Sequence, residues 1–194
     1  MARPNAKNKL TEAALQLMVG QGYSATTVDE ICEEAGVSKG SFYHFFSTKE
    51  DLGVEALGAY YKKGMQVMTG PFLQCEDPVE RAYAFLDHTE AVAKDLWSRG
   101  CLLGTFAVDL SESHPRIAQQ VSGLFNQMEE AISGIFVPFG SEDGNDGRPT
   151  AKTIASHFLA VVEGSIVMAR AHGDLDLIIR GLRHFRIYLR GLPR

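Results

Sequence analysis

Apolar residues recur every three or four positions along most of the chain, which is the spacing of one face of an amphipathic helix. In the segment 6–19 this face is formed by Leu10, Ala13, Ala14, Leu17 and Met18. No segment alternates apolar and polar residues in the way that predicts a β-hairpin. The spacing predicts an all-α fold of about nine helices. The expected helices cover residues 6–19, 27–35, 38–45, 47–68, 78–97, 101–110, 113–136, 150–171 and 175–189.

The segment 26–51 carries the most specific local signals. Thr27 and Glu30 form the T-x-x-E pattern of a capping box, so a helix begins there. Gly36 ends this helix, because glycine tolerates the left-handed conformation that many helix C-termini require. The two signals define one short helix followed by a tight turn.

The second helix of this segment opens with small, polar and basic residues and continues with aromatic ones. Ser38 can cap it, and the S-x-x-E pattern of Ser47 and Glu50 predicts the start of the next helix. This order suits a helix whose first turn enters a DNA groove while its later turns pack against the protein. The pattern predicts a helix-turn-helix and makes DNA binding the leading functional hypothesis.

The same residues resemble a known family. The run A-G-V-S-K-G-S-F-Y-H-F-F-S-T-K-E-D-L, together with A-A-L-Q-L-M-V-G-Q-G-Y-S-A-T-T-V-D-E-I before it, is similar to the signature of TetR-family transcriptional repressors over residues 9–57. The family often places histidine directly before the last phenylalanine. Here that position is Phe45, and the histidine is His44, so base preference does not transfer from other members.

The resemblance implies a three-helix DNA-binding domain at residues 1–50 and a helical effector-binding and dimerisation domain at 51–194. It also implies a homodimer that binds a double-stranded operator and a small effector. In the family the last two helices of each subunit form a four-helix interface. Apolar stripes on the last two expected helices fit this role, although such stripes can also form the core of one subunit. The stripes are Phe158, Val161, Val162, Ser165, Ile166 and Ala169, and Leu182, Phe185 and Leu189.

Eight residues are predicted to contact DNA. Lys39 can reach a guanine edge or a phosphate, and Gly40 allows close approach of the backbone. By resemblance, Lys49 binds a phosphate at the start of the next helix, and the helix N-terminus at Thr27 can bind another. The predicted contacts are Thr27, Ser38, Lys39, Gly40, Ser41, Tyr43, His44 and Lys49, and at least two of Phe42, Phe45 and Phe46 are assigned to the core.

The net charge of −5 limits the number of phosphate contacts. The expected basic groups are an arm formed by Arg3, Lys7 and Lys9, and the two lysines that flank the second motif helix. Most acids of the preceding helix are expected on its outer side. With so few cations in each subunit, useful affinity requires a dimer that reads two half-sites.

Composition and motifs predict a cytoplasmic protein without metal or cofactor. The chain is 45% hydrophobic, and we expect no membrane span and no signal segment. Three widely separated cysteines argue against a disulfide framework. No C-x-x-C or H-E-x-x-H pattern predicts a metal site.

The effector region is less defined. The phrase R-G-C-L-L-G-T-F-A-V-D-L resembles a subset of TetR regulators, some of which sense electrophiles or oxidants through the cysteine. A helix N-terminus at Cys101 would lower the pKa of its thiol, but free cysteine is also among the most buried residue types. An apolar effector is the other possibility. The candidate residues are Cys101, Trp97, Phe106, Phe125, Met128 and His157.

Two other functional classes compete with a DNA-binding regulator. A thiol enzyme using Cys101 would leave the segment 26–51 unexplained. A helical interaction protein that has lost DNA binding would have no need of Lys39, Tyr43 and Lys49. We therefore expect a regulator rather than an enzyme.

Overall fold

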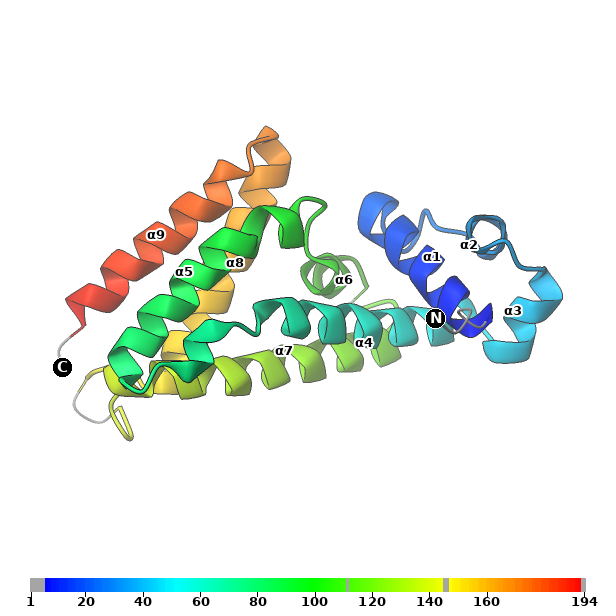
Figure 1. Cartoon of the computed structure of the whole chain (residues 1–194). Coiled ribbons are helices and arrows are strands. Elements are labelled where there is room, and N and C mark those ends of the chain that lie inside the picture. The colour runs from blue at the N-terminus through cyan, green and yellow to red at the C-terminus, as the bar shows by residue number, and fades with distance from the viewer. Residues whose placement is uncertain (1–5, 111, 145–146, 193–194) are drawn as a thin grey trace. The chain divides into compact units, whose positions relative to one another are not determined.

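The computed structural model describes residues 6–110, 112–144 and 147–192. This part of the chain is all-α, as the apolar spacing predicts (Figure 1). Its elements are α1 (Ala6–Gln21), α2 (Val28–Ala35), α3 (Lys39–Phe45), α4 (Lys49–Met68), η1 (Pro71–Gln74), α5 (Pro78–Trp97), α6 (Leu102–Leu110), α7 (Pro115–Phe136), η2 (Val137–Phe139), α8 (Ala151–His172) and α9 (Asp176–Gly191).

The predicted cap of α2 is confirmed, and α5 also begins with a capping residue. The Thr27 hydroxyl accepts a hydrogen bond from the Glu30 backbone, while the Glu30 carboxylate accepts one from the Thr27 backbone. Gly36 ends α2 with a φ of 62°, in the left-handed region. At α5, the Asp77 carboxylate caps the first turn and Pro78 occupies its first position. These signals are local, so they can be read from sequence.

The cap of α4 differs by one residue from the prediction. Thr48, not Ser47, accepts from the backbone of Asp51 at 3.1 Å, and the Asp51 carboxylate accepts from the Thr48 backbone at 3.0 Å. The predicted box of Ser47 and Glu50 is therefore wrong. Thr48 and Asp51 form an equivalent reciprocal pair one position later.

The chain divides into two compact units. The first unit comprises Met1–Lys63 with Cys101–Leu124, and the second comprises Gly64–Gly100 with Phe125–Arg194. Helices α6 and the first part of α7 thus belong with the helix-turn-helix. The domain boundary predicted at residue 50 would instead make each domain one continuous segment of the chain.

The core of the second unit is a cluster of phenylalanine rings. Phe85 of α5, Phe136 of α7, Phe158 of α8 and Phe185 of α9 are all buried. Phe158 lies 5.4 Å from Phe85 and 5.3 Å from Phe185 between ring centroids. Each of four helices contributes one ring, so this cluster is the shared anchor of the unit.

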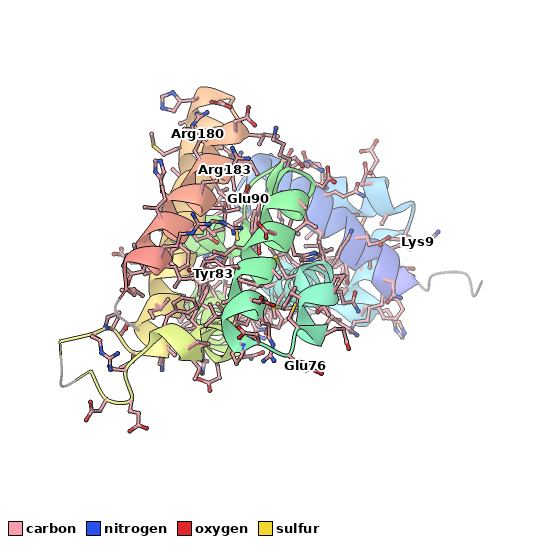
Figure 2. The ribbon with its side chains drawn as sticks, turned by 60° about the vertical axis from the view of Figure 1, so that its left-hand side comes forward. Lys9, Glu76, Tyr83, Glu90, Arg180 and Arg183 are labelled. Carbon is pink, nitrogen blue, oxygen red and sulfur yellow. The ribbon has the colours of Figure 1, made fainter. Side chains whose placement is uncertain are left out.

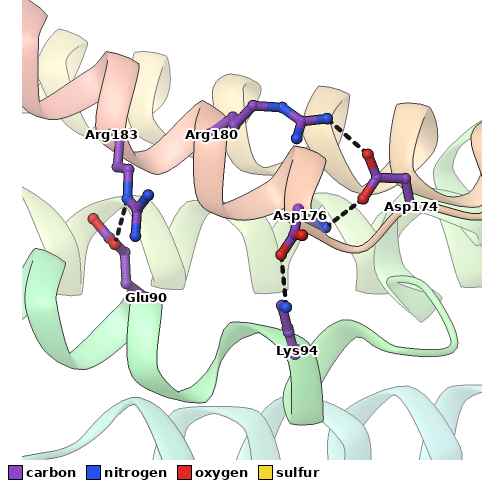
Figure 3. Close-up of polar contacts among 6 residues, drawn as sticks. All are labelled: Glu90, Lys94, Asp174, Asp176, Arg180 and Arg183. Carbon is purple, nitrogen blue, oxygen red and sulfur yellow. Dashed lines mark hydrogen bonds and ion pairs between the residues drawn. The ribbon is translucent and has the colours of Figure 1, made fainter.

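Ion pairs follow the contact between α5 and α9 (Figures 2 and 3). Arg183 of α9 donates to Glu90 of α5 at 3.1 Å, and Lys94 lies 2.6 Å from Asp176. A third pair joins Arg186 to Asp87. Because each pair has at least one partner that is more than half exposed, solvent screens it, and each is worth about 1 kcal/mol or less. They set the register of α9 on α5 more than they stabilise it.

Helices α8 and α9 lie side by side (Figure 1). Gly181 permits their close approach, because a Cβ at this position would overlap the Ser165 hydroxyl and lie 3.5 Å from Val161 Cγ1. The stripes predicted for a dimer interface mostly point inward: all their residues are buried except Val161 and Ser165, which are partly exposed. The buried members pack within the chain's own core, so the prediction that they face a partner subunit is wrong for them, whereas for Val161 and Ser165 it stays a prediction.

Helix α8 is long and apolar enough to suit a membrane span, with a mean hydropathy of 1.3 over a window that is 39% buried. From the sequence we expect no segment of this kind, and α8 is an exception by its length and composition. A core helix passes the same test, and α8 contributes Phe158, Val162 and Ile166 to the core of its unit.

Gly140 is expected to be essential for the entry into α8. A Cβ there would overlap the backbone nitrogen of Ala151 and lie 3.0 Å from its Cα. Because backbone cannot rotate away, Gly140→Ala should lower the free energy of unfolding by about 1–3 kcal/mol. Urea unfolding measures this change.

Gly134, exposed within α7, provides the control. No atom lies within 4 Å of a Cβ at this position. Gly134→Ala should raise stability by about 0.5–1 kcal/mol through helix propensity. Equal unfolding midpoints for the two variants would contradict the steric argument.

Candidate nucleic-acid interface

Helix α3 is fixed to the first unit by one side only. Phe42 is fully buried, and Phe46, the residue that ends the helix, is 4% exposed. Their rings lie 5.9 Å apart between centroids. Ser38 caps the helix by accepting from the Ser41 backbone at 3.2 Å. The prediction that at least two of the three phenylalanines pack in the core agrees with this burial.

The opposite side of α3 is exposed. Tyr43 is 56% exposed and Phe45 is 39% exposed, which are unusual values for such large rings. Phe45 is not among the predicted contacts, and it is exposed although it directly precedes the buried Phe46. The exposed residues are Ser38, Lys39, Gly40, Tyr43, His44 and Phe45, with Ser41 half-buried.

Gly40 has no structural need to be glycine. A Cβ at this position would meet only the Ser38 hydroxyl, at an ordinary 3.8 Å. Its backbone is helical, so no left-handed conformation requires glycine either. An exposed glycine without an internal reason leaves room for another molecule to approach the backbone of α3.

The Lys39 ammonium pairs with the carboxylate of Asp29 in α2, at 2.7 Å. This hydrogen bond raises the pKa of Lys39. Asp29 is therefore an exception to the expectation that the acids of α2 lie mostly on its outer side.

The polar groups of Thr27 serve its own helix. Its hydroxyl lies 2.8 Å from a Glu30 carboxylate oxygen, and its backbone N–H donates to the same oxygen at 2.7 Å. These bonds lower the pKa of Glu30. A phosphate at this place would face a carboxylate, so the predicted contact of Thr27 with phosphate disagrees with the geometry.

Lys49 closes the connection between α1 and α2. Its ammonium donates to the carbonyls of Tyr23 at 3.0 Å and of Thr26 at 2.9 Å. It also lies 4.2 Å from the centroid of the Tyr23 ring, a cation–π distance. Burial lowers the pKa of this ammonium. Two of its three donors are thus used inside the protein, a role that the sequence did not predict.

The predicted basic arm is only partly within the described residues. Arg3 lies outside them. Lys7 and Lys9 belong to α1, and Lys7 pairs with Glu55 at 2.8 Å. The segment around these lysines is therefore the first turn of a helix rather than an extended arm.

Tyr23 joins the helix-turn-helix to the rest of the first unit. Its buried ring meets Phe106 of α6 edge-on at 5.6 Å and His114 at 4.9 Å. Burial, with Glu50 and Asp51 nearby, raises its pKa to about 12. Phe106, predicted to line an effector pocket, packs in this core instead.

The other predicted effector residues differ in burial. Trp97 is buried in the second unit, and Phe125 and Met128 are half-buried along α7. His157 is exposed on α8, with its ring 4.7 Å from that of Tyr188. Its exposure disagrees with the prediction that it anchors a ligand inside a pocket.

None of the three cysteines, all of which lie in the described part of the chain, forms a disulfide. Cys101 directly precedes α6 and is 8% exposed, and Cys32 is 6% exposed. Burial raises the pKa of the Cys32 thiol, as expected for an inert cysteine. Cys75 is the more accessible thiol. The burial of Cys101 favours a packing role over a sensing role. Electrophile sensing by this thiol stays an untested prediction.

Comparison with known families and structures agrees with this geometry. The family model of bacterial regulatory proteins of the TetR family matches residues 10–56. The model of the C-terminal domain of LmrA/YxaF-like transcriptional regulators matches residues 78–181, more than half of the chain. The chain belongs to the TetR family of transcriptional regulators, and α2 and α3 are its DNA-binding helix-turn-helix.

Individual relatives cover most of the chain. The transcriptional repressor DhaR of Mycobacterium sp. (strain GP1) is 28% identical over 86% of this chain and 83% of its own length. The transcriptional regulator AcuR of Cereibacter sphaeroides is 29% identical over 85% of this chain and 76% of its own length. The crystal structure of a regulatory protein TetR from Rhodobacter sphaeroides has a TM-score of 0.78 and 26% identity, covering 97% of this chain and 99% of that one.

These relatives are transcriptional regulators, a class that is not in general enzymatic. TetR-family regulators bind DNA operators and small effectors as dimers. The family therefore accounts for the exposed side of α3, and the thiol enzyme has no support among the relatives.

Replacing Lys49 separates its structural role from a role at phosphate. Lys49→Met should lower the free energy of unfolding by about 1–2 kcal/mol, because two carbonyls lose a charged donor. If the ammonium also neutralises a phosphate, the slope of log affinity against log salt should fall in magnitude by roughly one. Lys9→Met, an exposed control on α1 (Figure 2), should leave stability unchanged. Unaltered unfolding of Lys49→Met would contradict the carbonyl bridge.

Thiol labelling should rank the three cysteines by exposure. At neutral pH, Cys75 should react with a maleimide well before Cys101 and Cys32, which mass spectrometry of tryptic peptides can follow. Single Cys→Ser variants assign each peptide. Faster reaction of Cys101 than of Cys75 would restore the sensing prediction.

Proposed function

We propose that the protein is a cytoplasmic repressor that binds a palindromic operator as a homodimer and is released by a small apolar molecule. The observation that carries this proposal is the two-sided character of α3. Phe42 and Phe46 fix the helix from inside, while polar, basic and aromatic side chains cover its outer side. A short helix held in this way suits the major groove.

The proposed DNA contacts are ranked by how far the polar groups of each residue are already bonded inside the protein. Ser38, Ser41, Tyr43 and His44 have exposed or partly exposed polar groups on α3. To contact DNA, the Lys39 ammonium has to break its ion pair with the Asp29 carboxylate or bind both partners at once. For Lys49 and Thr27 we propose at most a secondary contact, since internal partners use most of their donors.

Homodimerisation is proposed through α8 and α9, over their exposed surface, which includes the two partly exposed stripe residues Val161 and Ser165. Val167 is 64% exposed, Met168 49% and Ile187 65%. Between the two helices runs an open groove of about 370 Å³. It is lined by Ala160, Val161, Gly164, Ser165, Met168, Leu177, Arg180, Gly181 and His184. Small residues in such a groove allow a second pair of helices to approach closely, and a twofold dimer matches a palindromic operator.

The effector is proposed to be apolar because the second unit is rich in aromatic and aliphatic side chains. The name of the relative DhaR as a repressor supports repression here. Electrophile sensing is less well supported, because the thiol of Cys101 is buried.

DNA binding can be tested without disturbing the fold. Gel-shift titration should detect binding to duplexes tiled across the DNA upstream of the protein's own coding region. Gly40→Ala should weaken this binding more than about tenfold, since the added methyl lies between α3 and the duplex. Its unfolding midpoint should not fall, because the methyl meets nothing inside the protein. Failure of the wild-type protein to bind any fragment at low salt would refute the proposal.

The proposed dimer interface can be tested by placing one charged side chain in it. Val167→Asp should raise the dimer dissociation constant more than about tenfold, because an unpaired carboxylate is costly to bury. Val108→Asp is the matched control, since Val108 of α6 is 82% exposed and lies on another helix. Sedimentation velocity over a range of concentrations measures both. An unchanged dimer in Val167→Asp would move the interface elsewhere.

A further inference from the structure

The ion pair between Lys39 and Asp29 lies on the side of the helix-turn-helix that the proposed function assigns to DNA. Lys39 is the first residue of α3, and its Nζ lies 2.7 Å from Asp29 Oδ1. The side chains remain 55% and 73% exposed. Both groups are therefore within reach of a ligand that approaches α3.

Among the described residues, the Asp29 carboxylate has Lys39 as its one partner. The capping box of α2 uses Thr27 and Glu30, and the Asp29 carboxylate takes no part in it. Asp29 lies in the first turn of α2, where a negative charge gains only modestly from the helix dipole. Its main effect on the surface is to neutralise the cation that α3 presents.

We propose that Asp29 is an intramolecular competitor of DNA for Lys39, and that it lowers the affinity of the helix-turn-helix for every duplex. To contact a phosphate or a guanine, the Lys39 ammonium must give up or share the carboxylate. The proposal rests on the proposed function, because it requires that Lys39 contact DNA.

The size of the effect follows from the exposure of the pair. Exposed ion pairs are weak, so release of Lys39 should tighten binding by only about two- to fivefold. The pair must open before the ammonium contacts either a phosphate or a base. The same gain is therefore expected at the operator and at a scrambled duplex.

The test compares Asp29→Asn with Glu33→Gln. Glu33 lies on the same helix, is exposed, and its carboxylate has no ion pair among the described residues. Both variants remove one negative charge, so a general charge effect would be similar for them. Asp29→Asn should tighten binding to the upstream duplex by about two- to fivefold more than Glu33→Gln does. Its salt slope should steepen by up to about 0.9, because Lys39 then neutralises a phosphate in full.

Repeating the comparison in a Lys39→Met protein tests whether the tighter binding of Asp29→Asn depends on Lys39. In a Lys39→Met protein, Asp29→Asn should have no larger effect than Glu33→Gln. Equal effects of the two acid variants in the wild-type background would overturn the proposal, as would a gain from Asp29→Asn that persists in the Lys39→Met background. If Lys39→Met leaves binding unchanged while Gly40→Ala weakens it, the competition is refuted and the DNA-binding function stands. Circular dichroism of each variant verifies the fold.

Discussion

The placement of α3 depends on two phenylalanine rings. A helix of seven residues is too short to be stable by itself in water, so its position is set by what it buries. Phe42 and Phe46, four residues apart, lie on one side and enter the core of the first unit. Every residue on the other side is thereby held at a fixed rotation. The proposed contacts of Ser38, Lys39 and Tyr43 with DNA therefore depend on the packing of the two rings behind them.

The charges around this helix are largely used inside the protein. Lys7 pairs with Glu55, Lys39 with Asp29, and Lys49 donates to two carbonyls. The domain therefore presents a weaker field to DNA than its lysines suggest. Long-range attraction is small for a chain with a net charge of −5, so contacts at short range must provide the affinity. Two linked copies add those contacts without making either copy basic.

Whether an interaction can be predicted from the sequence depends on how far apart its partners lie along the chain. The capping box of α2 and the turn at Gly36 involve neighbours in sequence, so they were readable. The start of α4 was missed by one residue because Ser47–Glu50 and Thr48–Asp51 fit the same pattern equally well. The carbonyls that hold Lys49 are more than twenty residues away in sequence, and no spacing rule connects them. Lys39 and Asp29 are closer in sequence but belong to different helices, and no spacing rule connects them either.

Helix α8 shows why an apolar stripe alone cannot define an interface. Phe158, Val162 and Ile166 make the most conspicuous stripe, and they are buried against the chain's own phenylalanine cluster. Val167 and Met168 continue the apolar surface on the exposed side. A helix between a core and a partner must be apolar on both sides, and that requirement also gives it the hydropathy of a membrane span. A second copy over the groove of α8 and α9 would account for both properties at once, because it would remove the exposed apolar side from water.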